Sequence, residues 1–357
     1  MEERRNHSQA TDGLQMPDFI NHVPEARAFC ESVLRDASKF QLFPGEKFAE
    51  IGMGVISTTG TDSQGESLSV EALEKMCTQI ATEGLWGGAE HDPLIQVTGR
   101  IIAARIFYHP ESDTHFLATV FGNYDPSKLP RFRDLGITIP DVCEDDVGGL
   151  IEEDRPQVKL IYNSHEIPSD LIVDAVKEAP SVLDREVGES LRKAADPLAT
   201  IHLYVKLGFL LLNPFSKKFL EQMGKRLADE CVDFWKWVAT SLWKRVTTLR
   251  KSRLLVVFRT EYKGCDIEFV LDTTDQGVVS QALPVLHIGA QSAVKLVDAL
   301  EHLKPDKLVY EFVPGESTWK PLHAATRGAG VIAERPVLVD FRRYKGLSIG
   351  GMKHTRK

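Results

Sequence analysis

Residues 55–126 read VISTTGTDSQGESLSV (55–70), EALEKMCTQIATEG (71–84), LWGGAEHDP (85–93) and LIQVTGRIIAARIFYHPESDTHFLATVFGNYDP (94–126), and this stretch decides the fold. The polar cluster at 61–65 is typical of a turn, and Ser69 is a favourable N-cap for a helix over 70–82. Strand-forming residues then fill 97–108 and 114–121, with a proline-containing turn between them. The stretch therefore predicts a strand, a helix and a hairpin in succession.

Around this stretch, the sequence predicts a mixed, strand-rich first domain over residues 17–180. Apolar residues follow a proline at helical spacing over 24–40, and residues 47–59 and 158–162 have the composition of strands. The polar residues 1–16 predict a disordered tail, because they offer almost no apolar surface to bury.

The second half, residues 181–345, predicts a domain of a different kind. From Pro214 to Leu249 apolar residues recur at the spacing of one helical face, which predicts a long amphipathic helix. Short apolar runs before and after it predict a small sheet that this helix covers: 201–207, 254–260, 266–271, 308–313 and 336–342. Residues 346–357 predict a flexible tail. The expected fold class is therefore α+β with two domains.

Composition excludes several classes of protein. The 357 residues are 43% hydrophobic and 26% charged, as in soluble globular proteins, and the net charge of −8 argues against nucleic acid as a partner. Five cysteines without a Cys-x-x-Cys pair argue for a reducing, cytoplasmic setting and against a disulfide framework. The most hydrophobic window, 201–215, is too short to span a bilayer, and it contains Lys206. We therefore expect no transmembrane segment and no signal peptide.

The order of parts in the first domain resembles a known family. His91-Asp92-Pro93 stands between the predicted helix and the hairpin, Gly99-Arg100-Ile101 opens the hairpin, and Tyr124-Asp125-Pro126 closes it. This order resembles the N-terminal half of the tailed-phage prohead (capsid-maturation) proteases. The resemblance covers about a third of the chain. It implies a strand-rich, barrel-like domain similar to the prohead-protease/assemblin architecture, and a phage or anti-phage setting.

The resemblance also implies catalytic positions. In that family, the histidine of a His-Asp pair is the general base for a serine on a later strand, in a segment that reads roughly Gly-x-Ser-Ile-Gly. His91 matches the histidine, and the serine segment corresponds to Gly136–Pro140, where Thr138 stands in place of serine. The later acidic position aligns with 162–164, which contains no acid. The threonine methyl restricts χ1 and crowds nucleophilic attack.

These departures favour a non-catalytic recognition or effector protein on a degenerate protease-like scaffold. In that case Asp92 has a local role, in which it caps the turn that begins at Pro93. The alternative is an active endopeptidase with His91 as base and Thr138 as nucleophile. In a protease-like fold, we expect His91 and Thr138 on neighbouring strands with their side chains on the same side.

The predicted long helix carries three tryptophans and a basic end, namely Trp235, Trp237, Trp243, Lys244 and Arg245. Aromatic borders beside cations suit either a protein partner or peripheral contact with an anionic membrane surface. Both uses require exposed rings, so we expect at least one of Trp237 and Trp243 to be largely exposed. The third interpretation is a helix whose tryptophans pack on the C-terminal sheet.

The hairpin turn offers two histidines as candidate metal ligands. His109 and His115 flank the turn, and a hairpin can bring two such residues together. The acids between them, Glu111 and Asp113, are also typical of a solvated loop. The sequence therefore predicts no metal site, and no phosphate-binding glycine pattern indicates a cofactor.

Overall fold

The computed structural model describes residues 16–36, 47–61, 67–87, 92–140, 158–164, 166–183, 187–190, 199–211, 225–248 and 253–336. These residues divide into two compact units. The first unit comprises the described residues of Met1–Gly87 and Val97–Pro126, and the second comprises those of Gly88–Gln96 and Ser127–Val337. The predicted tails, 1–16 and 346–357, lie almost entirely outside the described residues.

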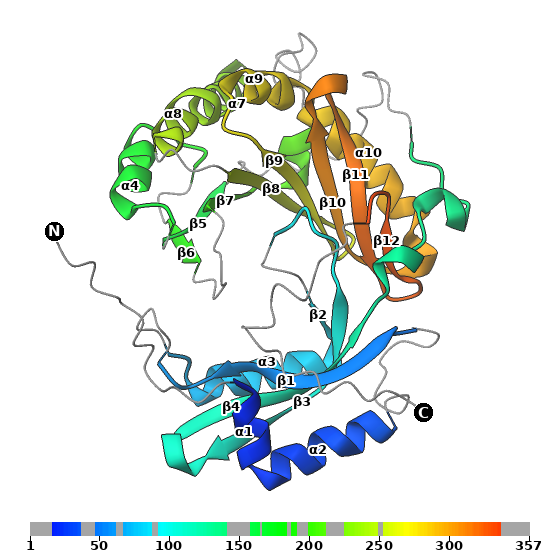
Figure 1. The fold of residues 1–357 in the computed structure, drawn as a ribbon. Helices are drawn as coiled ribbons and strands as arrows, with labels where there is room; N and C mark the ends of the chain where they lie inside the picture. The colour runs from blue at the N-terminus through cyan, green and yellow to red at the C-terminus, as the bar shows by residue number, and fades with distance from the viewer. Residues whose placement is uncertain are drawn as a thin grey trace, which may run out of the picture. The chain divides into compact units, whose positions relative to one another are not determined.

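The first unit is built on a four-stranded antiparallel sheet in the order β1-β4-β3-β2 (Figure 1). Its strands are β1 (Glu50–Thr58), β2 (Leu85–Gly87), β3 (Gly99–His109) and β4 (Thr114–Asn123). The hairpin between β3 and β4 turns through η2 (Pro110–Ser112), as the sequence predicts. Among the described residues the sheet is open, since β1 and β2 are its two edges. The expected barrel is therefore wrong.

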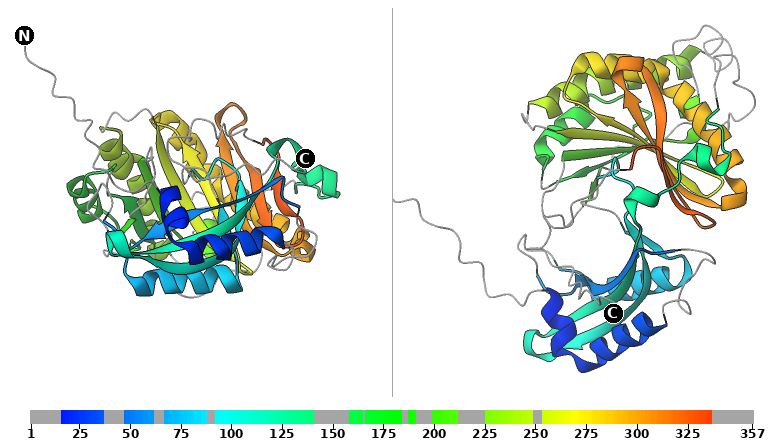
Figure 2. Two further views of the ribbon diagram at one scale, coloured as in Figure 1. Left: turned by 60° about the horizontal axis from the view of Figure 1, so that its bottom comes forward. Right: turned by 45° about the vertical axis from the view of Figure 1, so that its right-hand side comes forward.

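Three helices cover the two faces of this sheet: α1 (Met16–His22), α2 (Pro24–Arg35) and α3 (Val70–Thr82). Helices α1 and α2 share one apolar core with the sheet, and α3 shares a second core with the opposite face (Figure 2). Neighbouring residues of a strand point to opposite faces, so Ile101 joins the α3 core and Ile102 joins the other. Helix α3 begins where predicted, with the Ser69 hydroxyl accepting a hydrogen bond from the Ala72 N–H at 3.2 Å.

The second unit contains a mixed eight-stranded sheet in the order β12-β11-β10-β9-β8-β7-β5-β6. Its strands are β5 (Lys159–Asn163), β6 (Gly188–Ser190), β7 (Ala199–Tyr204), β8 (Leu254–Tyr262), β9 (Cys265–Asp272), β10 (Pro305–Val313), β11 (Thr318–Thr326) and β12 (Gly330–Ala333). This sheet is larger than expected. The sequence predicts β5 in the first domain, but its backbone pairs with β7 and it lies in the second unit, which also includes the described residues of Gly88–Gln96.

Helices cover one face of the eight-stranded sheet (Figures 1 and 2). They are α4 (Ser169–Lys177), α5 (Leu207–Leu211), α7 (Lys225–Trp237), α8 (Trp243–Thr247), α9 (Gln276–Ala282) and α10 (Leu286–Ala299). Alternate strand residues such as Phe258, Phe269 and Tyr310 face these helices in one large apolar core. The α+β class is confirmed.

The tryptophan-bearing helix belongs to this core. It runs as α7, a π-helical segment η5 (Val238–Leu242) and α8. Trp235, Trp237 and Trp243 are only 4%, 4% and 2% exposed. The Trp235 ring lies 5.6 Å from the Phe258 ring, and Trp237 Nε1 donates to the Ala175 carbonyl at 2.9 Å. The expectation of an exposed ring at Trp237 or Trp243 is therefore wrong, because these rings fill the space between the helix, the sheet and α4.

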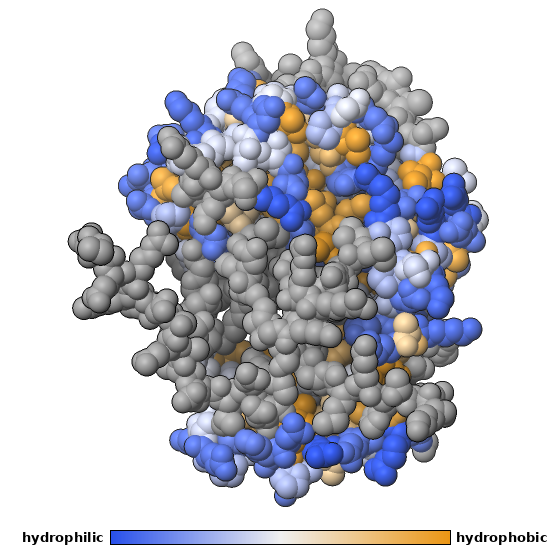
Figure 3. Space-filling view, in the orientation of Figure 1, coloured by the Kyte–Doolittle hydropathy of each residue, from blue (hydrophilic) through white to orange (hydrophobic). Residues whose placement is uncertain are grey.

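The described helices include none that combines the length and the apolarity needed to cross a membrane. On the side visible in Figure 3, hydrophilic residues occupy most of the described surface of the second unit, and apolar residues show between them in small groups.

Candidate functional site

A network of charged side chains, centred on the buried Glu268, lies on the face of the second sheet that points away from the helices. The network is formed by residues that alternate with the core residues along four strands. They are Tyr204 on β7, Arg259 on β8, Asp266 and Glu268 on β9, and Lys307 on β10. Arg259 and Glu268 are directly opposite each other in the β8–β9 ladder. Alternate residues of the same strands thus supply an apolar face and a charged face.

Glu268 is the centre of this network, and its side chain is 4% exposed. Lys307 Nζ lies 2.9 Å from one carboxylate oxygen, and Arg259 Nε lies 3.3 Å from the other. Burial by itself raises the pKa of Glu268, but the two cations outweigh burial and lower the pKa to about 2. Glu268 is therefore ionised at neutral pH, and it cannot serve there as a proton donor.

Arg259 connects the rest of the network. Its Nη1 donates to the Tyr204 hydroxyl at 2.7 Å, its guanidinium lies 4.9 Å from the Tyr204 ring centre, and its Nη2 pairs with the Asp266 carboxylate. Burial, followed by the negative charge of Glu268, raises the pKa of Asp266, and Arg259 partly opposes this rise. Two carboxylates and two cations balance one another, so this arrangement is held by internal pairing.

The Asp92–Leu94 stretch docks on the same face of the sheet. Asp92 Oδ1 accepts a hydrogen bond from the Leu94 N–H at 2.9 Å, and Oδ2 accepts one from Arg253 Nη1 at 2.5 Å. The Leu94 side chain packs against an apolar cluster that includes Val257 and Val309. The local capping role of Asp92 is confirmed, and its second oxygen is already used by Arg253.

His323 on β11 holds the next residue of this stretch. Its Nε2 lies 2.9 Å from the Pro93 carbonyl oxygen, which can only accept, so Nε2 carries the proton. Burial is the main reason that the pKa of His323 falls to about 4, and Lys307 adds to this effect against the hydrogen bond to Pro93. His323 is therefore neutral near pH 7. Its Nδ1 is buried without a hydrogen bond among the described residues.

Of the two predicted catalytic residues, the structure describes Thr138, whereas His91 lies outside the described residues. Thr138 is exposed and lies in a loop after η4 (Phe132–Leu135), not on a strand, so the expectation of a strand position is wrong. Gly136 turns the chain there with a φ of 72°, and Ile137 inserts into the core. The Thr138 hydroxyl has no hydrogen bond among the described residues.

Of the residues predicted to bind a partner, the three tryptophans are buried and the two cations are nearer the surface. Lys244 is exposed, and Arg245 is half-buried in an ion pair with Glu178 on the adjoining turn. Of the five predicted residues, Lys244 and Arg245 are therefore the two that a partner can reach.

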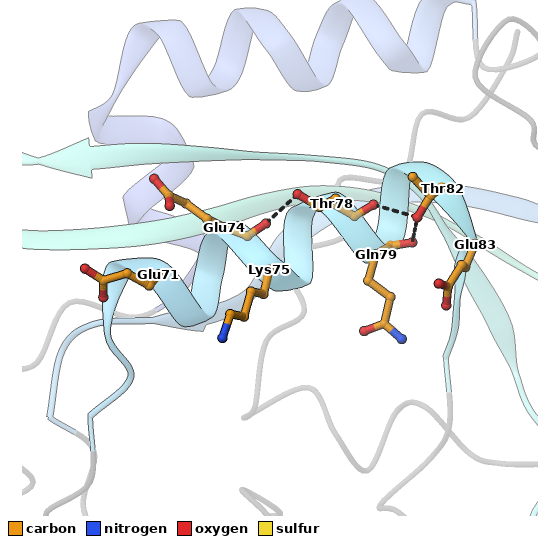
Figure 4. A pocket seen from close by; sticks show the side chains of 7 residues that line it. All are labelled: Glu71, Glu74, Lys75, Thr78, Gln79, Thr82 and Glu83. Atoms are coloured by element: carbon orange, nitrogen blue, oxygen red, sulfur yellow. Dashed lines mark hydrogen bonds between the residues drawn. The ribbon is translucent and has the colours of Figure 1, made fainter.

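A hollow of about 500 Å³ lies along α3, but its lining offers no available nucleophile. Its walls come from one helix: Glu71, Glu74, Lys75, Thr78, Gln79, Thr82 and Glu83 (Figure 4). The Thr78 and Thr82 hydroxyls donate to carbonyls one turn earlier, so neither is available as a nucleophile. These residues form an exposed acidic helix face.

Sequence reasoning missed the charged network. The signal was present in Asp266-Ile267-Glu268, where two acids alternate with an apolar residue inside a strand that is otherwise apolar. Such a pattern predicts charges on one face of a sheet. Their cationic partners on β8 and β10 could not be identified, because strand pairing joins residues far apart in sequence.

No protein-family model, curated protein or solved structure matches this chain. The resemblance to the prohead proteases rests on the sequence segments quoted above.

Proposed function

We propose that this protein is a non-catalytic recognition protein with a protein partner, on a scaffold similar to that of the prohead proteases and in a phage or anti-phage setting. The observation that carries the proposal is the hydrogen bonding of the Asp92 carboxylate. Both of its carboxylate oxygens are engaged, one by the Leu94 N–H and one by Arg253. The Asp92 carboxylate therefore serves the docking of its own segment, and the position that aligns with the family's acid, 162–164, contains no acid that could orient the histidine ring.

The position of Thr138 gives independent support. Thr138 is exposed in the loop after η4, whereas the family places its nucleophile on a strand. The charged network adds a third argument. Glu268 is ionised and paired, and His323 is neutral with a pKa of about 4, so neither has a pKa near the operating pH of a general acid or base.

The surface of the basic helix end suggests the character of the partner. Lys244 is exposed, and Arg245 forms an ion pair with Glu178. An acidic protein segment suits these cations better than a membrane does, because the aromatic rings that would enter a lipid interface are buried.

The decisive experiment compares purified wild-type protein with His91→Ala and Thr138→Ala. Each is incubated alone, with unfolded casein and with phage capsid protein, and the products are identified by mass spectrometry. We expect identical peptide patterns for the three proteins. A fragment that wild type produces and both variants fail to produce would establish the endopeptidase instead. Circular dichroism of each variant confirms that it is folded.

A further inference from the structure

Two histidines and a glutamate converge at one corner of the first unit. His22 ends α1, His109 ends β3, and Glu111 lies in the η2 turn that follows. One ring nitrogen of each histidine and a carboxylate oxygen of Glu111 all lie within 4.8 Å of one another. Among the residues that the structure describes, this is the one such group with the spacing of metal ligands.

His109 is the fixed member of the group. Its side chain is 1% exposed, and the Phe19 ring meets it edge-on with centroids 5.1 Å apart. The His22 ring stacks on it at 5.8 Å, with an angle of 24° between the ring planes. The ring is therefore oriented by packing before any ligand arrives, and orientation of this kind is what a metal site requires of its first ligand.

The two nitrogens of His109 have different surroundings. Nδ1 lies 2.9 Å from the Ser112 hydroxyl oxygen and 3.3 Å from the Ser112 N–H. Nε2 is buried and has no hydrogen-bond partner among the described residues. A buried polar atom left without a partner costs about 1–3 kcal/mol, so an unfilled Nε2 points to a missing ligand.

We propose that His22, His109 and Glu111 bind a divalent transition-metal ion of the zinc class. Nε2 of His109, a ring nitrogen of His22 and a carboxylate oxygen of Glu111 are its ligands, and water takes the fourth position. Two imidazoles with one carboxylate form a set that zinc favours, whereas magnesium and calcium prefer oxygen ligands alone. A metal ion on Nε2 requires the tautomer in which Nδ1–H donates to the Ser112 hydroxyl, 2.9 Å away, and the longer hydrogen bond that Nδ1 accepts from the Ser112 N–H at 3.3 Å is then lost.

The geometry needs only a small adjustment. Ligand atoms around tetrahedral zinc are about 3.3 Å apart, since zinc–nitrogen bonds are about 2.0–2.1 Å long. His22 and Glu111 are exposed, and neither has a hydrogen bond or ion pair among the described residues. Their side chains can therefore rotate toward the fixed His109 ring, so that the ion joins α1 to the β3–β4 hairpin.

His115 is not part of this site. In the β3–β4 ladder it pairs with Tyr108, whereas His109 pairs with Thr114, so the rings of His109 and His115 are on opposite faces of the sheet. The His115 ring lies 5.0 Å from the Tyr108 ring. This register explains why the histidine pair considered from the sequence does not meet, and it makes His115 a matched control on the same hairpin.

Isothermal titration calorimetry with Zn²⁺, on full-length protein dialysed against a chelator, tests the proposal. We expect one ion per chain, and we expect His22→Gln and Glu111→Gln each to weaken binding at least about tenfold. Both residues are exposed, so these variants should fold. His109 is buried, so His109→Gln is a secondary test, because it can also disturb folding. The control His115→Gln should bind as wild type does.

Thermal unfolding gives a second readout, because an ion that binds only the folded state raises Tm. Zn²⁺ should raise the Tm of wild type and His115→Gln more than that of His22→Gln. When Co²⁺ replaces Zn²⁺, the absorption bands of tetrahedral Co²⁺ should appear with wild type and be absent with Glu111→Gln. Absence of Zn²⁺ binding, or binding of equal strength in wild type, His22→Gln and Glu111→Gln, would overturn the proposal.

Discussion

Arg253 and Asp92 are 161 residues apart in sequence, and Arg253 Nη1 donates to Asp92 Oδ2 at 2.5 Å. The same guanidinium donates from Nε to Asp272 Oδ2 at 2.7 Å, at the end of β9. One side chain beside β8 thereby connects the end of β9 to the Asp92–Leu94 stretch. The Asp92 side chain is 4% exposed, so Arg253 supplies the cation that pairs with a carboxylate removed from solvent.

Replacement of Arg253 with Ala should lower the free energy of unfolding by about 2–3 kcal/mol, because it leaves a buried carboxylate unpaired. Urea denaturation followed by circular dichroism measures this loss. In an Asp92→Asn background the same replacement should cost less, since the charge is gone while Oδ1 still accepts from the Leu94 N–H.

The matched control is Lys263→Ala. Lys263 pairs with Asp298 where both side chains are well exposed, at 47% and 44%, and such pairs contribute at most about 1 kcal/mol. Equal losses for Arg253→Ala and Lys263→Ala would contradict a special role of the Asp92 pair.

His323 should make stability depend on pH. Its pKa is about 4 in the folded protein, below the ordinary value of 6.5, so between these values the unfolded chain binds a proton that the folded chain does not. The stabilisation is complete above pH 6.5 and is lost as pH falls toward 4. The total is roughly 3 kcal/mol for a shift of this size.

His323→Gln isolates this contribution, because the glutamine amide can still donate to the Pro93 carbonyl but does not titrate. Its unfolding free energy should fall less than that of wild type between about pH 6.5 and pH 5. This window lies above the ordinary glutamate value of 4.5, so Glu268 does not confuse the result. His302→Gln, at an exposed position, is the control, and a slope for His323→Gln equal to that of wild type would refute the assignment.

Local signals in the sequence predicted local structure well. Ser69 caps α3 as expected, and the turn after His109 closes the β3–β4 hairpin. Each of these depends on residues within a few positions of one another, where propensity and capping decide the outcome. The existence of β8, β9 and β10 also follows from their apolar runs.

Long-range pairing could not be predicted in the same way. The residues of β5 predict a strand but do not indicate which sheet it joins. Its hydrogen bonds to β7 place it in the second sheet. His22 was not predicted as a neighbour of His109, because α1 must first dock on the sheet. The candidate sites are therefore products of tertiary contacts.

The tryptophans show a second limit. The apolar spacing predicts a regular α-helix, but the π-helical turn Val238–Leu242 adds about one residue to the turn and rotates Trp243 toward the core. Trp237 precedes this turn, and it is covered by α4, where it donates to the Ala175 carbonyl. Neither effect has a signal in the apolar spacing of the helix itself.

The buried tryptophans predict that this helix does not enter membranes. In the free protein, tryptophan emission should be blue-shifted relative to that of the unfolded chain and resistant to iodide quenching. Anionic liposomes should not change it. Trp237→Ser and Trp243→Ser should each lower the free energy of unfolding by about 3–5 kcal/mol, as expected when a large core side chain is removed. The exposed neighbour supplies the control, since Lys244→Ser should change stability by less than about 0.5 kcal/mol. A liposome-induced blue shift that disappears in folded Trp237→Ser protein would show instead that the ring leaves the core to reach lipid.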